Sequence, residues 1–140
     1  MIETFISINN NEDIIQLPIP LEEYSINSPF ANQKVNGLHQ NLNMIGLRDL
    51  KTVDFTSFFP IRDFPFLQNR SMWGMEYVDK IEQWRNRRIP IRLIIVDNNK
   101  KKNINMAVTL DSFEWDIKQD GNINYSMNFT EFPFVNLKRG

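Results

Sequence analysis

The sequence predicts an α+β fold, in which a predominantly antiparallel β-sheet forms a sandwich or a partly open barrel and one main α-helix packs on it. Short segments of alternating apolar and polar residues recur along the chain, separated by turn signals such as Asn-Gly and Asp-Gly. One segment, Met75–Arg88, has the apolar spacing of a helix. With 140 residues and 41% hydrophobic side chains, the chain is expected to form a single domain with its own core.

The N-terminal third predicts short strands joined by turns. Four strands are expected, at Thr4–Ile8, Asp13–Leu17, Glu23–Ile26 and Gln33–Val35. Pro18 and Pro20 keep the segment after the second strand out of a sheet interior, because proline donates no backbone hydrogen bond. Asn36-Gly37 is a turn signal, and Met44–Gly46 is expected to be a short strand end.

The middle of the chain predicts a strand followed by an aromatic loop. In the expected strand Leu50–Phe58, neither alternating set of side chains is purely polar, so both faces are expected to be covered. Residues 59–74 contain two prolines and four large aromatic residues, which predicts a loop of high apolar content. We expect this loop to become ordered only when the protein is assembled with its partners.

The last part of the chain predicts a helix, a strand and a hairpin of two long strands. Tyr77, Val78, Ile81 and Trp84 follow helical spacing on one face, and Pro90 ends the helix. Strands are then expected at Ile91–Val96, Ile104–Trp115 and Ile123–Phe132, separated by polar turns at Asp97–Lys102 and Lys118–Gly121. Simple alternation in the middle strand puts Met106, Val108 and Leu110 on one face and Ala107, Thr109, Asp111, Phe113 and Trp115 on the other.

The composition argues against several classes of function. The net charge is −1, so we expect no bulk attraction to nucleic acid or to an anionic membrane. The apolar runs are too short to span a bilayer, and the first residues lack the pattern of a signal peptide. The chain has no cysteine, which excludes disulfides and thiolate chemistry.

Residues suited to catalysis are scattered, and we expect no enzyme, no cofactor and no metal. His39 is the one histidine and lies in a polar segment without a nucleophile motif. Two acidic pairs, Glu22-Glu23 and Asp111 with Glu114, are candidates for glycosidase carboxylates and are better explained as solvated side chains. Asp116–Gly121 has a faint likeness to a calcium loop but lacks its regular acidic positions.

Basic residues cluster at the end of the predicted helix. They are Arg85, Arg87, Arg88 and Arg92. Capping of the helix C-terminus by Arg87 and Arg88 explains the cluster, and binding of nucleic acid through it is the alternative. The lysines at 100–102 are expected at a solvated hairpin tip.

The aromatic loop is the candidate interaction site. Aromatic residues and arginine are enriched at protein interfaces, which predicts a protein-binding surface. The candidate residues are Phe59, Arg62, Phe64, Phe66 and Trp73. The alternative is that the loop folds back and completes the core, and both interpretations can hold for different residues. The chain has 11 Phe against 3 Tyr, which also favours a protein covered by partners.

Ordered motifs in the second half resemble a phage baseplate family. They are LRDL (47–50) leading to SFFP (57–60), Tyr77-Val78 with Ile81 and Trp84, Pro90–Ile95, Val108–Phe113, and Gly121–Tyr125 with Phe129–Phe132. The chain is similar in these motifs to the LysM-containing baseplate or hub-associated proteins of contractile phages and phage-tail-like particles of Gram-positive bacteria. The likeness covers roughly residues 15–135. It divides the single domain 1–140 into an N-terminal part (1–46), a family-like core (47–135) and a tail (136–140).

The resemblance implies a structural role in a contractile tail. The protein is expected at the baseplate of a virion or bacteriocin-like particle, assembled in the bacterial cytoplasm, in multiple copies around the tail axis. Its implied partners are tube, hub, wedge and sheath proteins, with no nucleic acid and no membrane. The chain departs from the family at Asn122, where members have aspartate, and in lacking the LysM module, so peptidoglycan binding is not carried over. The alternative function is a tail-associated protein that binds or hydrolyses the cell wall.

Overall fold

The computed structural model describes residues 2–9, 11–37, 40–97 and 102–133 of the chain. Its strands, in chain order, are β1 (Ile2–Ile8), β2 (Asp13–Gln16), β3 (Ser25–Asn27), β4 (Gln33–Asn36), β5 (Asn41–Met44), β6 (Thr52–Phe59), β7 (Ile91–Asp97), β8 (Lys102–Ile117) and β9 (Ile123–Glu131). The helix α1 (Met75–Asn86) lies between β6 and β7 in the sequence. The predicted α+β class is confirmed: antiparallel strands dominate and one helix packs on them.

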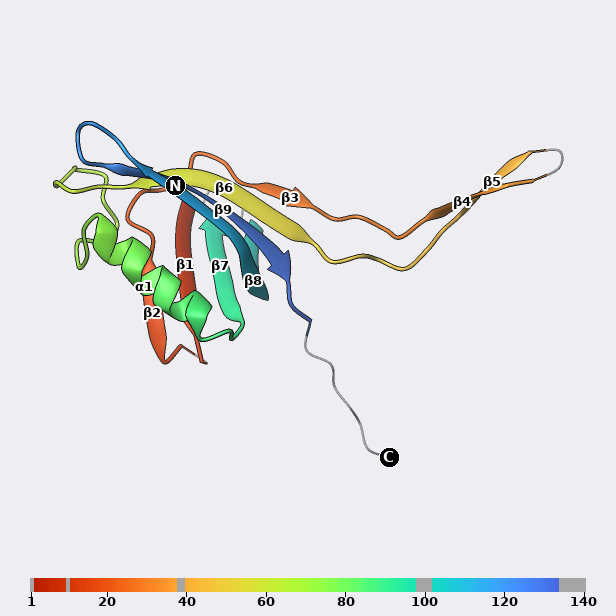
Figure 1. Ribbon diagram of the computed structural model, residues 1–140, viewed down its shortest axis with the longest axis horizontal. Coiled ribbons are helices and arrows are strands. Elements are labelled where there is room, and N and C mark those ends of the chain that lie inside the picture. The colour runs from red at the N-terminus through yellow and green to blue at the C-terminus, as the bar shows by residue number, and fades with distance from the viewer. Residues whose placement is uncertain (1, 10, 38–39, 98–101, 134–140) are drawn as a thin grey trace, which may run out of the picture.

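Seven strands form one antiparallel sheet in the order β2-β1-β7-β8-β9-β6-β3 (Figure 1). The long strand β8 pairs with different strands along its two ends and so divides the sheet into two halves. Its residues Lys102–Val108 pair with β7, and its residues from Val108 to Ile117 pair with β9. The first half-sheet is therefore β2-β1-β7-β8, and the second is β8-β9-β6-β3.

The core lies between the half-sheets and the helix, and alternation in the strands fills it. In β9, the predicted set Ile123, Tyr125, Met127 and Phe129 is buried. The three central residues of β7 that point inward, Ile91, Leu93 and Ile95, are buried as well. Apolar faces from both half-sheets thus meet in one core, as expected for strands with a period of two.

Three stacked rings occupy one end of this core. The ring of Phe59 stacks on Tyr125 with centroids 4.1 Å apart and on Tyr77 of the helix with centroids 4.8 Å apart. Phe59 has no exposed surface. Burial raises the pKa of Tyr77 to about 12, because the phenolate loses its hydration there. The stack joins β6, β9 and α1 into one packed unit.

Helix α1 closes the open side of the sheet. Its buried residues are the four predicted ones, Tyr77, Val78, Ile81 and Trp84. Side chains on its flanks reach both half-sheets: Lys80 Nζ pairs with Asp13 of β2 at 2.9 Å, and Arg85 donates to the carbonyl of Asp111 at 3.5 Å. The helix ends at Asn86, earlier than predicted, because Arg88 adopts a positive φ of 58° and turns the chain toward Pro90.

Two predictions about strand faces are wrong. A β-bulge between Leu110 and Ser112 inserts one residue into β8, so Phe113 is buried on the side of Val108 and Leu110 instead of opposite them. In β6, only one face is covered within this chain: Val53, Phe55 and Phe59 are buried, whereas alternate residues such as Thr56 are exposed. The predicted turn at 97–102 and the predicted tail at 136–140 lie largely or wholly outside the described residues.

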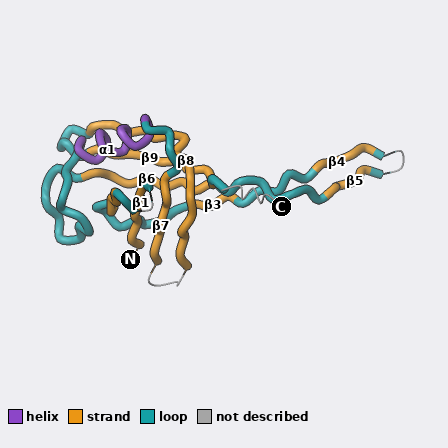
Figure 2. Tube along the Cα trace, turned by 90° about the horizontal axis from the view of Figure 1, so that it is seen from below, coloured by secondary structure: helices purple, strands orange, loops and turns teal. Residues whose placement is uncertain are grey.

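A two-stranded arm extends from the sheet. Strands β4 and β5 pair only with each other and project away from the sandwich (Figures 1 and 2). We define the arm as residues 28–51, between β3 and β6. The pairing of β3 with Thr52–Asp54 anchors its base to the large sheet.

Candidate interaction surfaces

The arm has one apolar face, and its side chains are exposed. Val35 faces Leu42 across the hairpin, and Met44 lies on the same side, whereas Lys34 faces Asn43 on the opposite side. Every described residue of β4 and β5 is exposed. A lone two-stranded hairpin is at best marginally stable in water. The arm therefore has the properties of a segment that is completed by another chain.

The base of the arm exposes further apolar side chains and is tied down by an ion pair. Ile45 and Leu47 are each 85% exposed. Beside them, Arg48 Nη1 donates to Glu131 Oε1 of β9 at 2.8 Å, and the backbone N–H of Lys51 donates to the same oxygen at 3.2 Å. The hydrogen bond from Arg48, followed by that from Lys51, holds the pKa of Glu131 below its usual value. The ion pair fixes where the arm leaves the sheet.

The structure divides the predicted aromatic site between core and surface. Phe59 belongs to the ring stack in the core, so it offers no surface to a partner. Phe66 is exposed and stacks on Phe64, with centroids 5.2 Å apart. Phe64 and Trp73 are partly buried, and Arg62 is exposed and donates to the carbonyl of Asp120 at 3.1 Å. Arg62, Phe64, Phe66 and Trp73 remain a predicted interface.

The aromatic loop is attached to the segment after β2 through two neighbouring residues in its interior. The backbone N–H of Gln68 donates to the carbonyl of Pro18 at 2.8 Å, and the side chain of Asn69 donates to the carbonyl of Gln16, also at 2.8 Å. Leu67 is buried. The expectation that this loop orders only on assembly stays a prediction, and its test is limited proteolysis of the free protein.

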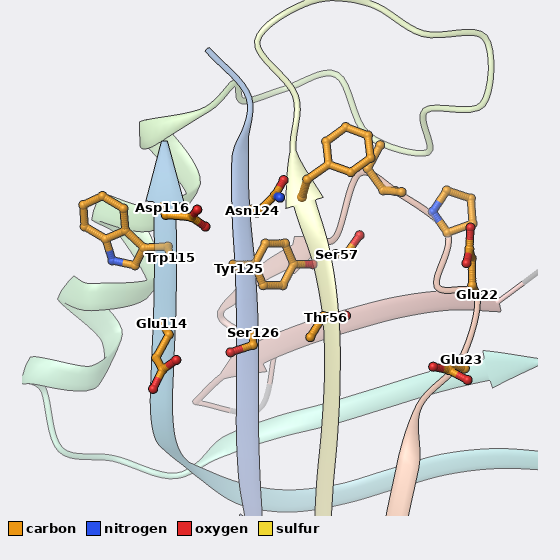
Figure 3. A pocket seen from close by; sticks show the side chains of 13 residues that line it. Glu22, Glu23, Thr56, Ser57, Glu114, Trp115, Asp116, Asn124, Tyr125 and Ser126 are labelled. Carbon is orange, nitrogen blue, oxygen red and sulfur yellow. The ribbon is translucent and has the colours of Figure 1, made fainter. Parts of the chain in front are cut away.

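A groove of about 630 Å³ crosses the outer face of the second half-sheet (Figure 3). Its floor is polar and includes Thr56 of β6 with Asn124 and Ser126 of β9. One side is formed by β8, and the other by the segment that follows β2. The lining residues on these sides are Glu114, Trp115 and Asp116 on β8, and Ile19, Pro20, Glu22 and Glu23 on the segment. The groove is therefore wide, open and acidic.

The acidic residues in this groove come from separate parts of the chain. Glu22 and Glu23 lie on one side and Glu114 on the other, with β9 and β6 between them. Asp111, the remaining acidic candidate from the sequence, accepts hydrogen bonds from Thr109 and Thr130.

The remaining candidates from the sequence have local partners. Asp116 pairs with Lys118 at 2.7 Å, and Asp120 accepts from the N–H of Asn122 at 3.0 Å, as in a hairpin turn. Arg85 pairs with Glu82 at 2.9 Å, and Arg92 donates to Asn105 at 2.7 Å. His39 lies outside the described residues. Within the described ranges, no group of three or more acidic or histidine side chains is placed to hold a metal ion.

The sequence interpretation did not identify the arm as an interaction surface. The signal was present: Asn36-Gly37 lies between two segments in which apolar residues alternate with Lys or Asn, which is the pattern of an amphipathic hairpin. Short strands were predicted there, but the sequence did not show that their apolar face is exposed.

Among the described helices, none is long and apolar enough to cross a membrane.

Comparison with known proteins shows the fold. No protein-family model matches the chain, and no curated protein matches it. Solved chains with a similar structure include two from gene transfer agent particles. One, from the virion of a native gene transfer agent (GTA) particle, has a TM-score of 0.58 at 9% identity, covering 94% of this chain and 92% of the other. The second, from the tail of an empty GTA particle with C6 symmetry, has a TM-score of 0.58 at 7% identity, covering 98% and 96%. The LysM-containing family is not confirmed by these comparisons.

Proposed function

We propose that this protein is a non-enzymatic structural subunit of a phage-type tail, present in several copies around the tail axis. The observation that carries the proposal is the arm, whose apolar face is exposed although the rest of the chain has a closed core. A protein built in this way is completed by assembly. The similar fold of chains in GTA particles, one of them in a tail with C6 symmetry, supports the same role.

The finer proposal places the subunit in the baseplate, where it joins tube and hub to wedge or sheath proteins. It rests on the motif resemblance from 47 to 132. The GTA chains support a role in a tail or virion without specifying the baseplate. Electron microscopy of particles from a gene-deletion strain distinguishes a general tail role from a baseplate role. Tails that form without a baseplate when the gene is deleted support the finer proposal, and the absence of all tails supports a tube subunit instead.

The arm provides the direct test of the assembly role. In a strain deleted for the gene, the chain is supplied with Val35→Ser and Leu42→Ser together, which removes the facing apolar pair. We expect a folded protein and a loss of at least roughly tenfold in complete particles, because the partner loses its apolar contact, worth ~1.5–3 kcal/mol per buried side chain. Particles are counted by negative-stain electron microscopy.

The opposite face of the same hairpin supplies the matched control. Lys34→Ser with Asn43→Ser changes the facing polar pair at the same distance from the base. It is expected to leave particle numbers close to those of the unmodified protein. Equal numbers of particles with both double variants would contradict the role of the arm.

A further inference from the structure

A pocket of about 540 Å³ lies between the C-terminal end of α1, strand β8 and the residue that follows β9. Part of its lining is apolar: Ile91 and Leu110 are buried, Ile89 is partly buried, and the ring of Phe132 is 39% exposed. Its charged lining residues are Glu82, Arg85 and Arg88. We call it the Arg88 pocket. It combines an open apolar surface with two arginines against one carboxylate.

The two arginines of the pocket differ in their partners. Arg85 donates to Glu82 at 2.9 Å and to the carbonyl of Asp111 at 3.5 Å, so its charge is compensated within the chain. The carboxylate of Asp111 accepts hydrogen bonds from Thr109 and Thr130. Within the described residues, the exposed side chain of Arg88 has no hydrogen bond or ion pair. The uncompensated charge at the pocket is therefore that of Arg88.

The backbone of Arg88 makes an arginine at this position unexpected. Its φ of 58° is left-handed, and the other described non-glycine residues with positive φ are Asn9 and Asn11, of a type that tolerates this conformation. Just after a helix, glycine avoids the strain. The backbone N–H groups of Arg87 and Arg88 already satisfy helix carbonyls, so no arginine side chain is needed for capping. A strained residue without a role inside the chain indicates a role in binding.

Charge and shape together select the kind of ligand. An arginine binds a carboxylate through two parallel N–H donors, and arginine beside an aromatic ring is typical of protein interfaces. Nucleic acid is disfavoured, because Glu82 lies at the rim and the chain has a net charge of −1. Residues 134–140 carry Lys138 and Arg139 and no acidic side chain, so charge does not favour them as the ligand.

We propose that the Arg88 pocket binds an acidic segment of a neighbouring tail protein, whose aspartate or glutamate pairs with Arg88 while an adjacent apolar side chain packs against Phe132 and Ile89. This inference rests on the proposed function, from which it takes only that other tail proteins surround the chain. The arm is not part of this contact.

A titration of the purified full-length protein tests the chemistry of the pocket without any particle. The probe is N-acetylphenylalanine, which joins a carboxylate to an aromatic ring, and its neutral amide is the matched control probe. We expect NMR shifts centred on Ile91, Leu110 and Phe132, with half-saturation on the order of 1 mM. The neutral amide is expected to bind at least roughly fivefold more weakly.

Variants assign the preference for the carboxylate to one residue. Arg88→Asn removes the charge, and asparagine tolerates the left-handed backbone, so a folded protein that binds both probes equally is expected. Arg87→Asn, at the exposed neighbour that does not line the pocket, is expected to keep the preference. Equal affinity of the unmodified protein for the two probes would overturn the proposal.

Cross-linking in particles tests the partner. In the complemented deletion strain, Arg88→Lys places an amine at the pocket, and a carbodiimide condenses it with a carboxylate in contact to form an amide. We expect a new covalent product in which position 88 is joined to an aspartate or glutamate of a different protein, located by mass spectrometry. Arg87→Lys is expected to give at least roughly fivefold less of this product.

The outcomes separate this proposal from the proposed function. If particles contain the chain but Arg88→Lys gives no more product than Arg87→Lys, or joins two copies of this chain, the inference about the pocket is wrong and the tail role stands. If the chain is absent from particles, the tail role fails. The titration then decides alone whether the pocket takes an acidic, apolar ligand, and equal binding of the two probes rejects it.

Discussion

The body of this protein, which consists of the seven-stranded sheet and α1, differs from the arm in how its apolar side chains are covered. In the body, apolar faces of the strands β1, β2 and β6–β9 and of one helix meet in a core that buries the rings of Phe59, Tyr77 and Tyr125. In the arm, the strands have the same alternation, but the apolar face of β4 and β5 is exposed. Local sequence pattern is thus similar in both regions, and only tertiary packing distinguishes them. The difference supports the proposal that the arm is completed by a partner.

The largest effect is expected from a change in the body. Phe59→Ala removes the middle ring of the stack between Tyr77 and Tyr125 and is expected to lower the free energy of unfolding by about 3–5 kcal/mol. Chemical denaturation measures this change in the free energy of unfolding. Phe58→Ala is the matched control at the neighbouring position. Its half-exposed ring touches Phe64 edge-on, and its loss is expected to cost about 1 kcal/mol. Equal costs would show that burial in the stack does not govern stability.

A second effect concerns the backbone of the arm. In the free protein, amides of β4 and β5 are expected to exchange with solvent roughly a thousandfold or more faster than those of β9, because opening the lone hairpin does not require global unfolding. Hydrogen–deuterium exchange followed by mass spectrometry measures both regions in one experiment. Assembled particles are expected to show slowed exchange in the arm. Arm amides as protected as those of β9 in the free protein would contradict the comparison.

The smallest effect is expected at the junction between the two regions. Glu131 has a lowered pKa in the folded protein, so its ion pair with Arg48 stabilises the fold above the ordinary carboxyl pKa of about 4.3. This contribution is lost as the pH falls through the folded pKa. Arg48→Met is expected to raise the pKa of Glu131 toward its ordinary value, as followed by NMR titration of the carboxyl group. An unchanged pKa would show that the N–H of Lys51 alone lowers it.

Much of the fold was predictable because local pattern and tertiary packing agree in it. The buried faces of α1 and β9 follow directly from helical and alternating spacing. The side of the sheet on which Phe113 lies was predicted wrongly. A bulge changes the alternation in β8, and the amino-acid sequence of the strand does not indicate the bulge. The end of the helix was placed too late because the positive φ of Arg88 is imposed by the turn to Pro90.

The candidate site was predictable only in part. Aromatic composition identified the loop after β6, yet it did not separate Phe59, which lies in the core, from Phe66, which is exposed. The exposure of the arm depends on which strands the rest of the described chain leaves uncovered. That property follows from the pairing of residues far apart in the sequence, and a single sequence does not display it.

The order of strands in the large sheet also affects when the protein can fold. Strand β1 pairs with β7, so Ile2 lies opposite Asp97, and β6 pairs with β9, so Thr52 lies opposite Thr130. Such long sequence separations slow folding, because loop closure must precede the contacts that reward it. On the ribosome, β1 emerges long before β7 and β6 long before β9, whereas the arm needs only local contacts. A nascent chain therefore exposes its strands until synthesis reaches β9, which makes late folding the vulnerable step in producing this protein.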